Sequence, residues 1–485
     1  DGHQGYGISL SAPNQGVTDN PVVTTFAGSG SYGSADGTGT SASFRYPEGM
    51  TSDGTNFYVA DKVSHKIRKI VISTGVVTTL AGTGSAGSTD HNTGTSATFR
   101  KPAGITTDGT NLYVADTDNH LIRKIVISTG VVSTIAGSGS PGFANGTGTS
   151  AIFKYPEGIT TDGTNLYVTE VAHKIRKIVI ATGAVTTLAG SGAAGFADGT
   201  GPSAIFRKPK GITTDGTNLY VADRKNHRIR KIVISTGVVT TIAGSGSEGS
   251  TDGTGAGASF NNPTGITSDG TILYVVDRDN HKIRKIVIST GVVTTLAGTG
   301  SSGSADGTGT AATFNTPIRI TTEGTKLYVA DTNNHKIRKI DLSKTETAVV
   351  SLLNLGDDFP NTPKIAVSGL MSNSGQLTFK NSEITLSGGA SLTAGSFDVT
   401  GTKVIVSDNF TKTGGTVTAN TATLKLDNSS IVTSNDGLIF QDLDLNNSTL
   451  TLGSATSDLT VSNAVTLDNA AEGINVGIAD LTLSG

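Results

Sequence analysis

The stretch YVADTDNHLIRKIVISTG, residues 113–130, decides the fold, because close copies of it occur five more times along the chain. It holds an Asp, a His and a Lys/Arg cluster within a short span, which are residue types common in active sites. The tyrosines of the copies are 53 to 55 residues apart: Tyr58, Tyr113, Tyr167, Tyr220, Tyr274 and Tyr328. A period of this length indicates a repeat architecture, so the stretch is first of all a structural unit.

Each repeat contains four short segments rich in β-branched and aromatic residues. They follow the order PxGITT, LYVAD, HKIRKIVI and VVTTLAG, with the turns DGT and STG between them. Such segments, bounded by turn residues, predict strands, and none has the 3.6-residue period of a helix. Six units of four strands predict an all-β fold with a six-bladed β-propeller over residues 22–348.

The first VVTTL-type segment, Val22–Ala27, precedes any inner strand. We therefore expect it to form the outermost strand of the last blade and to pair near Lys336–Ile340. This pairing would join the two ends of the ring and leave no blade edge unpaired.

The motifs PxGI, LYVAD and NHKIRKI, at residues 102–105, 112–116 and 334–340, resemble those of the NHL-repeat propellers. The segments between blades, such as AGSGS followed by DGTGTSASF, are also similar to those of many bacterial NHL proteins. The resemblance covers about residues 22–342. Members of this family serve as protein- or RNA-binding platforms, as sensor domains and occasionally as lyases, so the resemblance implies a fold without naming an activity.

The composition excludes several kinds of chemistry. The 485 residues include no Cys and no Trp, which excludes disulfides, thiolate catalysis and Cys-ligated zinc. The sequence contains no run of 18 apolar residues, so it has no segment that could span a membrane as a helix.

A chain rich in Ser, Thr, Asn and Gly that begins at Asp1 without Met fits a secreted protein whose leader was removed, although a trimmed sequence would look the same. We expect an extracellular or cell-surface location.

The repeated histidines and aromatic residues are predicted to be structural. Six His residues at equivalent positions of different blades lie too far apart to share one metal, so each is expected to bond to the turn beside it. The phenylalanines Phe44, Phe99, Phe153, Phe206, Phe260 and Phe314 and the LYVAD tyrosines are expected to fill the space between blades. We predict no catalytic residue, no metal ligand and no cofactor.

The charged groups of KIRKIVI lie beside the Asp that ends the preceding strand. We expect Asp–Arg/Lys pairs across the strands, and the alternative is an exposed basic ring for acidic partners. The GSADGTGT segments are expected to be long Gly-rich loops. Calcium is the less favoured interpretation of these loops, because each copy offers only one acid.

The candidate binding site lies where the repeats differ, around the Pro that begins each inner strand. We expect these residues at the mouth of the central channel, since the long loops deliver the chain there, while the opposite face carries only tight turns. Eight basic residues against Glu48 and Glu157 give a net charge of +6, and two tyrosines add planar surfaces. The predicted ligand-binding residues are Arg45, Tyr46, Arg100, Lys101, Lys154, Tyr155, Arg207, Lys208, Lys210 and Arg319. This set suits an acidic polysaccharide or another polyanion; the alternative is a solvated loop face.

The composition changes near residue 345, where Arg disappears and short alternating strands with Gly/Asn turns begin. Residues 349–485 resemble the β-solenoids of filamentous-haemagglutinin and autotransporter-type surface proteins, and a β-sandwich is the alternative. The sequence ends at ADLTLSG without a capping element, so either the natural chain continues past Gly485 or this end meets another subunit. Residues 1–21 are expected to be an N-terminal arm.

The two regions differ in charge. Residues 349–485 carry 5 Lys/Arg and 13 Asp/Glu, a net charge of −8, while the remainder has a net charge of +5. This difference predicts head-to-tail self-association into a filament. We interpret the protein as a non-enzymatic, secreted structural or adhesive subunit of a fibre or surface layer. A monomeric adhesin for acidic polysaccharide is the first alternative, and a propeller lyase or lactonase is the second.

Overall fold

The computed structural model describes residues 21–342 in full, together with the backbone pairing of strands between Lys364 and Leu483. The chain divides into two compact units, one of which is the propeller, Asp19–Ser343. The predicted arm of residues 1–21 lies outside the described residues except for Pro21. Among the residues described, no helix is long and apolar enough to cross a membrane.

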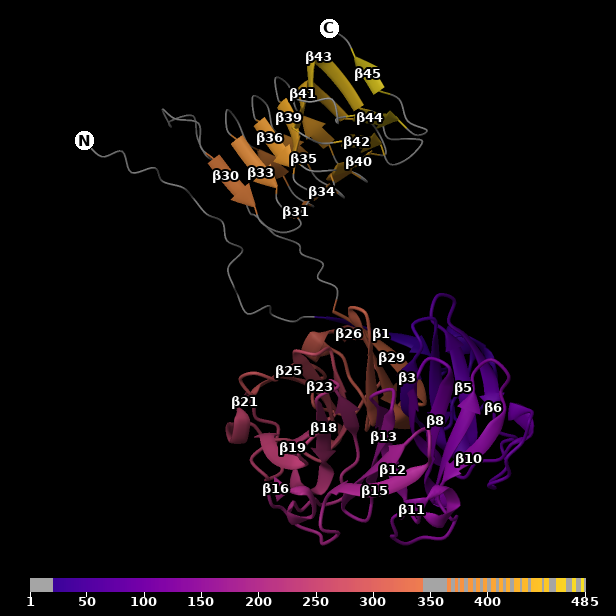
Figure 1. Cartoon of the computed structure of the whole chain (residues 1–485). Coiled ribbons are helices and arrows are strands. Elements are labelled where there is room, and N and C mark those ends of the chain that lie inside the picture. The colour runs from indigo at the N-terminus through magenta and orange to yellow at the C-terminus, as the bar shows by residue number, and fades with distance from the viewer. Residues whose placement is uncertain are drawn as a thin grey trace. The chain divides into compact units, whose positions relative to one another are not determined.

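Six antiparallel sheets form the propeller, so the predicted all-β six-bladed architecture is confirmed (Figure 1). Blade one contains β3 (Pro47–Ser52), β4 (Asn56–Asp61), β5 (Lys66–Val71) and β6 (Val76–Ala81). Blade two contains β7 (Pro102–Thr107), β8 (Asn111–Asp116), β9 (Leu121–Val126) and β10 (Val132–Ala136). Blade three contains β12 (Pro156–Thr161), β13 (Asn165–Glu170), β14 (Lys174–Val179) and β15 (Ala184–Ala189).

The remaining blades follow the same plan. Blade four contains β17 (Ile212–Thr214), β18 (Asn218–Asp223), β19 (Arg228–Val233) and β20 (Val238–Ala243). Blade five contains β22 (Pro263–Ser268), β23 (Ile272–Asp277), β24 (Lys282–Val287) and β25 (Val292–Ala297). Blade six contains β27 (Arg319–Glu323), β28 (Lys326–Asp331), β29 (Lys336–Asp341) and the N-terminal strand β1 (Val22–Ala27).

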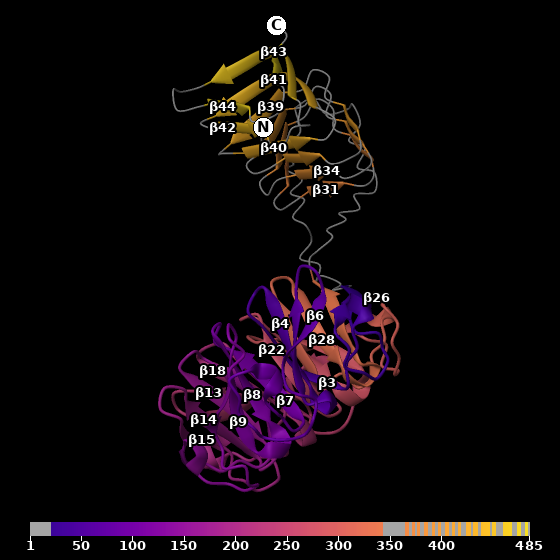
Figure 2. The same ribbon diagram turned by 90° about the vertical axis from the view of Figure 1, so that its right-hand side faces the viewer.

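The predicted closure by the N-terminal strand is confirmed. β1 pairs antiparallel with β29, with Val23 opposite Ile340 and Thr25 opposite Arg338. The inner strands contact one another in ring order, and β27 of blade six contacts β3 of blade one. The ring is therefore closed by strands from both ends of the propeller sequence, which Figure 2 shows as indigo and orange strands in one blade.

The loops between blades are more ordered than a Gly-rich sequence suggests. In five of the six blades the loop adds a two-residue strand to the outer edge of the sheet. These strands are β2 (Gly37–Thr38), β11 (Gly146–Thr147), β16 (Gly199–Thr200), β21 (Gly253–Thr254) and β26 (Gly307–Thr308). In blade one, Gly37 pairs with Val77 and Thr38 with Val76. The expected long Gly-rich loops are present, and their short strands give the backbone groups of the outermost strand hydrogen-bond partners.

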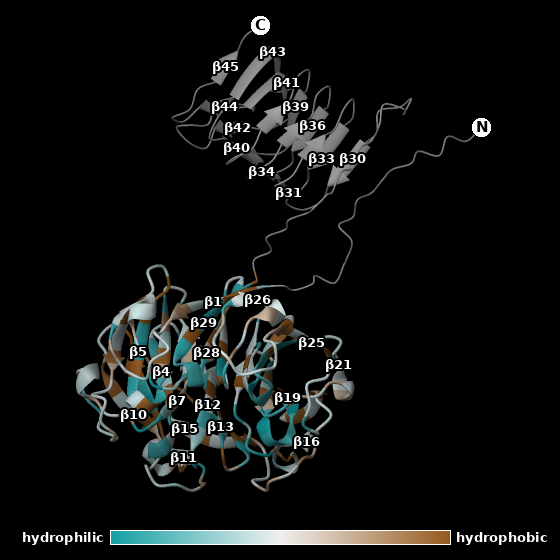
Figure 3. Ribbon diagram, turned by 180° about the vertical axis from the view of Figure 1, so that it is seen from behind, coloured by the Kyte–Doolittle hydropathy of each residue, from teal (hydrophilic) through white to brown (hydrophobic). Residues whose placement is uncertain are grey.

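The hydrophobic core lies between the blades. Six clusters of buried residues each join two neighbouring blades; one contains Tyr58 and Ile67 of blade one with Phe99 and Leu112 of blade two. The repeated tyrosines and phenylalanines are buried in these clusters, as expected. Figure 3 shows hydrophobic positions along the strands of the blades.

The C-terminal strands pair in parallel. One sheet contains β30 (Lys364–Val367), β33 (Glu383–Leu386), β36 (Lys403–Val406), β39 (Thr423–Asp427), β41 (Leu438–Asn446), β43 (Leu459–Leu467) and β45 (Leu481–Leu483). A second contains β31 (Met371–Asn373), β34 (Ala390–Leu392), β37 (Phe410–Lys412), β40 (Ser430–Ser434), β42 (Thr449–Leu452) and β44 (Gly473–Val476). A third contains β32 (Gln376–Thr378), β35 (Ser396–Asp398) and β38 (Thr416–Thr418). The solenoid interpretation stays a prediction.

Candidate functional site

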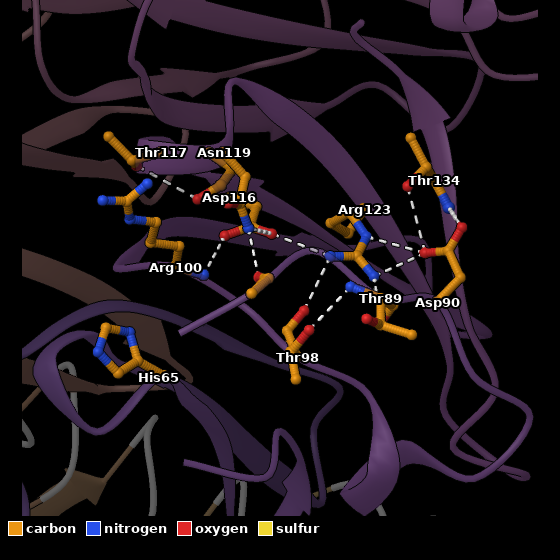
Figure 4. Close-up of polar contacts among 12 residues, drawn as sticks. His65, Thr89, Asp90, Thr98, Arg100, Asp116, Thr117, Asn119, Arg123 and Thr134 are labelled. Atoms are coloured by element: carbon orange, nitrogen blue, oxygen red, sulfur yellow. Dashed lines mark hydrogen bonds and ion pairs between the residues drawn. The ribbon is translucent and has the colours of Figure 1, made fainter. Parts of the chain in front are cut away.

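Each blade contains one fully buried arginine, from the third position of the KIRKIV strand. In blade two, Arg123 Nη1 lies 2.9 Å from Asp116 Oδ2 and donates to the Thr98 carbonyl at 3.0 Å (Figure 4). Its Nη2 lies 2.6 Å from Asp90 Oδ1, on the loop between blades. The equivalent arginines are Arg68, Arg176, Arg230, Arg284 and Arg338.

This arrangement decides between two interpretations of the repeated charges. The predicted pairing of Asp and Arg across neighbouring strands is confirmed, and the exposed basic ring is wrong for the arginines, because they are buried. The loop acids are second partners of the arginines: Asp36, Asp90, Asp198, Asp252 and Asp306. Each of these carboxylates therefore already has an arginine as its partner.

Blade three departs from this pattern. Glu170 replaces the strand Asp, and Asn145 replaces the loop Asp. Arg176 Nη1 still lies 2.7 Å from Glu170 Oε1, and Nη2 donates to Asn145 Oδ1 at 3.1 Å. Burial raises the pKa of Glu170 to about 7 despite the charge of Arg176. Blade three therefore keeps the buried arginine, but this arginine has one carboxylate partner where those of the other blades have two.

The six histidines connect neighbouring blades. All six have a left-handed backbone, as at His120, where φ is 58°; five follow a 3-10 turn, and His173 lies in the turn between β13 and β14. The Nδ1 of His120 accepts a hydrogen bond from the backbone N–H of Tyr155 in blade three, at 3.2 Å. The other five histidines accept a backbone N–H in the same way: His65, His173, His227, His281 and His335.

The expectation that these histidines bond to the turn beside them was wrong. The positive φ directs the side chain away from its own strand and toward the start of the next inner strand. An Nδ1 that accepts an N–H must be unprotonated, and burial lowers the pKa of all six. They act as contacts between blades, and no group of metal ligands is found among the residues described.

The predicted site residues divide into an exposed set and a buried set. Seven are exposed at the start of the inner strands: Tyr46, Arg100, Lys101, Lys154, Tyr155, Arg207 and Lys208. Arg45 is half-buried, with its guanidinium 4.4 Å from the centre of the Tyr32 ring. Lys210 and Arg319 are buried instead, and so is Glu48.

The buried set forms a charged layer across the central channel. Lys210 Nζ lies 3.2 Å from Glu157 Oε2 and 3.6 Å from Glu48 Oε2, while Lys62 Nζ lies 2.8 Å from Glu48 Oε1. Arg319 donates from Nη2 to the Glu157 carbonyl at 3.0 Å. Burial alone would raise the pKa of Glu48, but the charges of Lys210 and Lys62 lower it to about 2.

This layer corrects the expected charge of the channel mouth. Lys210 and Arg319 are held among Glu48 and Glu157, so these four residues do not belong to the exposed surface. Lys101 Nζ also has a partner, Asp118 Oδ2 at 2.9 Å. The exposed cations without an acidic partner in the described part of the chain are Arg100, Lys154, Arg207 and Lys208. We call these four residues the cationic face.

Arg319 differs from the residue at the equivalent position of every other blade. In the other five blades the equivalent residue is Gly, and each of these glycines lies against a carbonyl of the next inner strand. A Cβ on Gly211, for example, would collide with the Thr264 carbonyl oxygen. Blade six has TPIRI where the others have PxGI, and this difference is the signal in the sequence. Arg319 is thus the one side chain that enters the channel at this level.

A cavity of about 160 Å³ lies in the channel beside Arg319. Its walls come from the inner strands, on the side of the charged layer that leads to the Asp-Gly-Thr turns. The tight turns on this face therefore do not fill the channel behind them.

The chain's described N-terminal region is a six-bladed β-propeller of antiparallel sheets, and the NHL repeat model matches residues 206–232, in its fourth blade. The chain is 31% identical over 350 residues to NHL repeat-containing protein 2 of Gallus gallus, covering 64% of this chain and 48% of that protein. It is 35% identical over 290 residues to the protein SUPPRESSOR OF QUENCHING 1, chloroplastic, of Arabidopsis thaliana, covering 55% of this chain and 27% of that protein. The chain thus spans less than half the length of these relatives.

Solved structures show the same fold. A protein of unknown function from Bacteroides thetaiotaomicron has a TM-score of 0.51 at 21% identity, covering 66% of this chain and 76% of that one. A protein described as an auxiliary nutrient binding protein from the same organism has a TM-score of 0.50 at 21% identity, with the same coverage. At this level of identity the similarity concerns the fold alone.

Proposed function

We propose that the propeller is a non-catalytic binding module that holds a polyanion, such as an acidic polysaccharide, on the cationic face. The observation that carries the proposal is the exposure of Arg100, Lys154, Arg207 and Lys208 without acidic partners. Unlike the buried arginines, these groups are free to contact a ligand. Such cations attract and orient an anionic chain, and arginine binds carboxylates through two parallel hydrogen bonds.

The cationic face is also asymmetric. Its four residues come from blades two, three and four, while blades five and six carry Asn261 and Asn315 at the positions of Arg100 and Arg207. Tyr155 lies beside Lys154 and is 38% exposed, so it offers a planar surface to a sugar ring. The ligand would therefore lie across three neighbouring blades.

The test is the binding of polygalacturonate to the full chain at low and at high salt. We expect affinity to fall as salt rises, because exposed charges are screened. Replacing Arg207→Glu and Lys208→Glu together should weaken binding about tenfold or more, which corresponds to about 1.4 kcal/mol. The matched control is Lys177→Glu with Lys231→Glu, which makes the same change of charge on the third strands of blades three and four. Equal binding by both double variants would contradict the proposal.

A secreted, head-to-tail filament is the second candidate, and the charge difference between the two regions supports it. Residues 349–485 have a net charge of −8 and the remainder +5. In this proposal residues 349–485 form a β-solenoid, which the parallel pairing of their strands favours over an antiparallel β-sandwich. Electron microscopy of the native protein should show filaments or sheets at low salt that disperse at high salt. Single particles at every salt concentration would exclude the filament.

Absence of catalysis is part of the proposal. A lyase or lactonase would need an asymmetric histidine or metal site, whereas all six repeat histidines hold backbone N–H groups of the neighbouring blade. Turnover of a lactone or of a uronate polymer by the purified chain would overturn this part.

A further inference from the structure

The central channel contains a second place where the six-fold repeat is broken. Along each inner strand the residue order runs from the charged layer to the Gly position, then to an aliphatic residue, and then to a Thr. The cavity of about 160 Å³ is lined by these last three levels. Arg319 occupies the Gly position in blade six and also lines the cavity.

Beyond the Gly position, two levels of residues line the cavity. The first level consists of aliphatic residues whose side chains belong to the hydrophobic clusters between the blades: Met50, Ile105, Ile159, Ile212, Ile266 and Ile320. The second level, the threonine ring, consists of Thr51, Thr106, Thr160, Thr213, Thr267 and Thr321. Each hydroxyl can donate one hydrogen bond and accept two, so this ring can surround a small polar ligand from all sides.

Arg319 has a donor that the protein leaves unused. The residue is 8% exposed, and its two terminal nitrogens donate to the carbonyls of Lys210 and Glu157. Its Nε is buried without a hydrogen-bond partner. The Nε atoms of five of the six blade arginines are buried without a partner as well, so the case for a ligand depends on the cavity and on the charge of Arg319 beside it.

Arg319 also has no ion-pair partner within 4 Å among the described residues. Glu48 pairs with Lys62 and Lys210, and Glu157 pairs with Lys210. Buried charges are normally compensated, because an unpaired charge loses its hydration. A bound anion would give Arg319 a partner of opposite charge.

We propose that the channel cavity binds a small oxyanion, a carboxylate or a phosphate, with Arg319 as its charge partner and the threonine ring as hydrogen-bond donors. The volume has room for several water molecules or for one small acid, but not for a polymer chain. This site is separate from the cationic face and does not depend on it. The two sites lie on opposite sides of the charged layer and use different residues.

The test is isothermal titration of the full chain with succinate, acetate and inorganic phosphate, each at the same ionic strength as a sodium chloride reference. We expect saturable binding of at least one of these anions. A preference for succinate or acetate identifies a carboxylate site, and a preference for phosphate identifies a phosphate site. No binding beyond the chloride reference by any of the three overturns the proposal.

The decisive variant is Arg319→Gly, which installs the residue that the other five blades carry and is therefore expected to fold. It should weaken anion binding about tenfold or more, and Arg319→Lys should restore part of it. The matched control, Lys231→Ala on the third strand of blade four, also removes one positive charge and should leave the binding of small anions unchanged. Equal anion binding by Arg319→Gly and the unaltered chain would overturn the proposal.

A second variant keeps the proposal testable if Arg319→Gly does not fold. Thr160→Val with Thr213→Val keeps the shape of the cavity and removes two hydroxyls, so small-anion binding should weaken while polygalacturonate binding does not. If neither binding changes, the threonine ring is not part of a site. Loss of polygalacturonate binding alone, in the Arg207→Glu/Lys208→Glu variant, reports on the proposed function and leaves this inference intact.

Discussion

Arg123 and Asp116 form an ion pair inside blade two, with Nη1 2.9 Å from Oδ2 and both side chains fully buried. The pair joins the second and third strands of the blade, and Arg123 reaches on to the loop residues Thr89 and Asp90 (Figure 4). One arginine thus fixes two strands and the loop between blades. The same relationship recurs in every blade, which explains why the repeat keeps its charged residues.

Removal of Arg123 should be strongly destabilising. Arg123→Met leaves Asp116 buried without its countercharge, and breaking a buried pair in this way costs about 3–5 kcal/mol. Urea unfolding should show this loss. Lys124→Met, one position further along the same strand and only half-buried, is the control, and its effect should stay within about 0.5 kcal/mol. Equal effects of the two substitutions would contradict the structural role of the buried pair.

Closure of the ring by β1 should make two adjacent valines respond differently. Val23 is fully buried against blade six, whereas Val22 is 49% exposed. Val23→Ala should lower the free energy of unfolding by about 1–3 kcal/mol, because it removes buried apolar surface and leaves a cavity. Val22→Ala should change it by less than about 0.5 kcal/mol. If urea unfolding shows no difference between them, β1 does not close the ring in solution.

The channel glycines should not tolerate a side chain. Gly211→Ala would place a Cβ against the Thr264 carbonyl, so the inner strands of blades four and five must move apart. We expect a loss of about 1–3 kcal/mol or more in the free energy of unfolding. The control is Gly257→Ala, where nothing lies within 4 Å of the new Cβ and no positive φ is required. That substitution should be neutral or stabilise by a few tenths of a kcal/mol, as thermal melting of both variants can show.

The histidine contacts between blades should make stability depend on pH. Burial lowers the pKa of His120 from the ordinary value of 6.5, so the unfolded chain takes up a proton at a higher pH than the folded chain. The contribution of His120 is therefore present above pH 6.5 and is lost as the pH falls toward its folded pKa. The slope is at most about 1.4 kcal/mol per pH unit for one histidine.

Two buried carboxyls act in the opposite direction over the same range. Burial raises the pKa of Asp116 to about 6 and that of Glu170 to about 7, so their protonation favours the folded state as the pH falls. The measurement should therefore compare the unaltered chain with His120→Asn between pH 7.5 and pH 5.5, since Asn adopts the left-handed conformation and does not titrate. Unfolding of the variant should be less sensitive to acid. The same pH dependence in both chains would show that His120 does not titrate with folding.

Much of the fold could be predicted from local and repeated patterns. The number of blades follows from the spacing of the tyrosines, and the pairing of β1 follows from counting VVTTL-type strands. The Asp–Arg pair could be anticipated because Asp116 and Arg123 lie near the facing ends of adjacent strands joined by a short turn. In each case the relevant residues are neighbours in sequence or recur at a fixed period.

The channel could not be predicted in this way. Glu48, Glu157, Lys210 and Arg319 come from four different blades and meet only because the ring closes. The sequence therefore predicted that Lys210 and Arg319 lie at the exposed mouth of the central channel, whereas the structure buries them beside the carboxylates of Glu48 and Glu157. The two-residue strands within the long loops were missed for a related reason, since the partners of Gly37 and Thr38 lie on the outer strand of the blade that follows them.

The sequence by itself determined the strands, the blade count and the strand that closes the ring, because these depend on periodicity, turn residues and β-branched segments. Only the tertiary structure decided which charges are buried, which blade each histidine touches and where a small ligand fits in the channel. Those properties depend on distances across the axis and between blades. Such distances are set by packing around the closed ring, where one residue such as Arg319 can fill space that five glycines leave open.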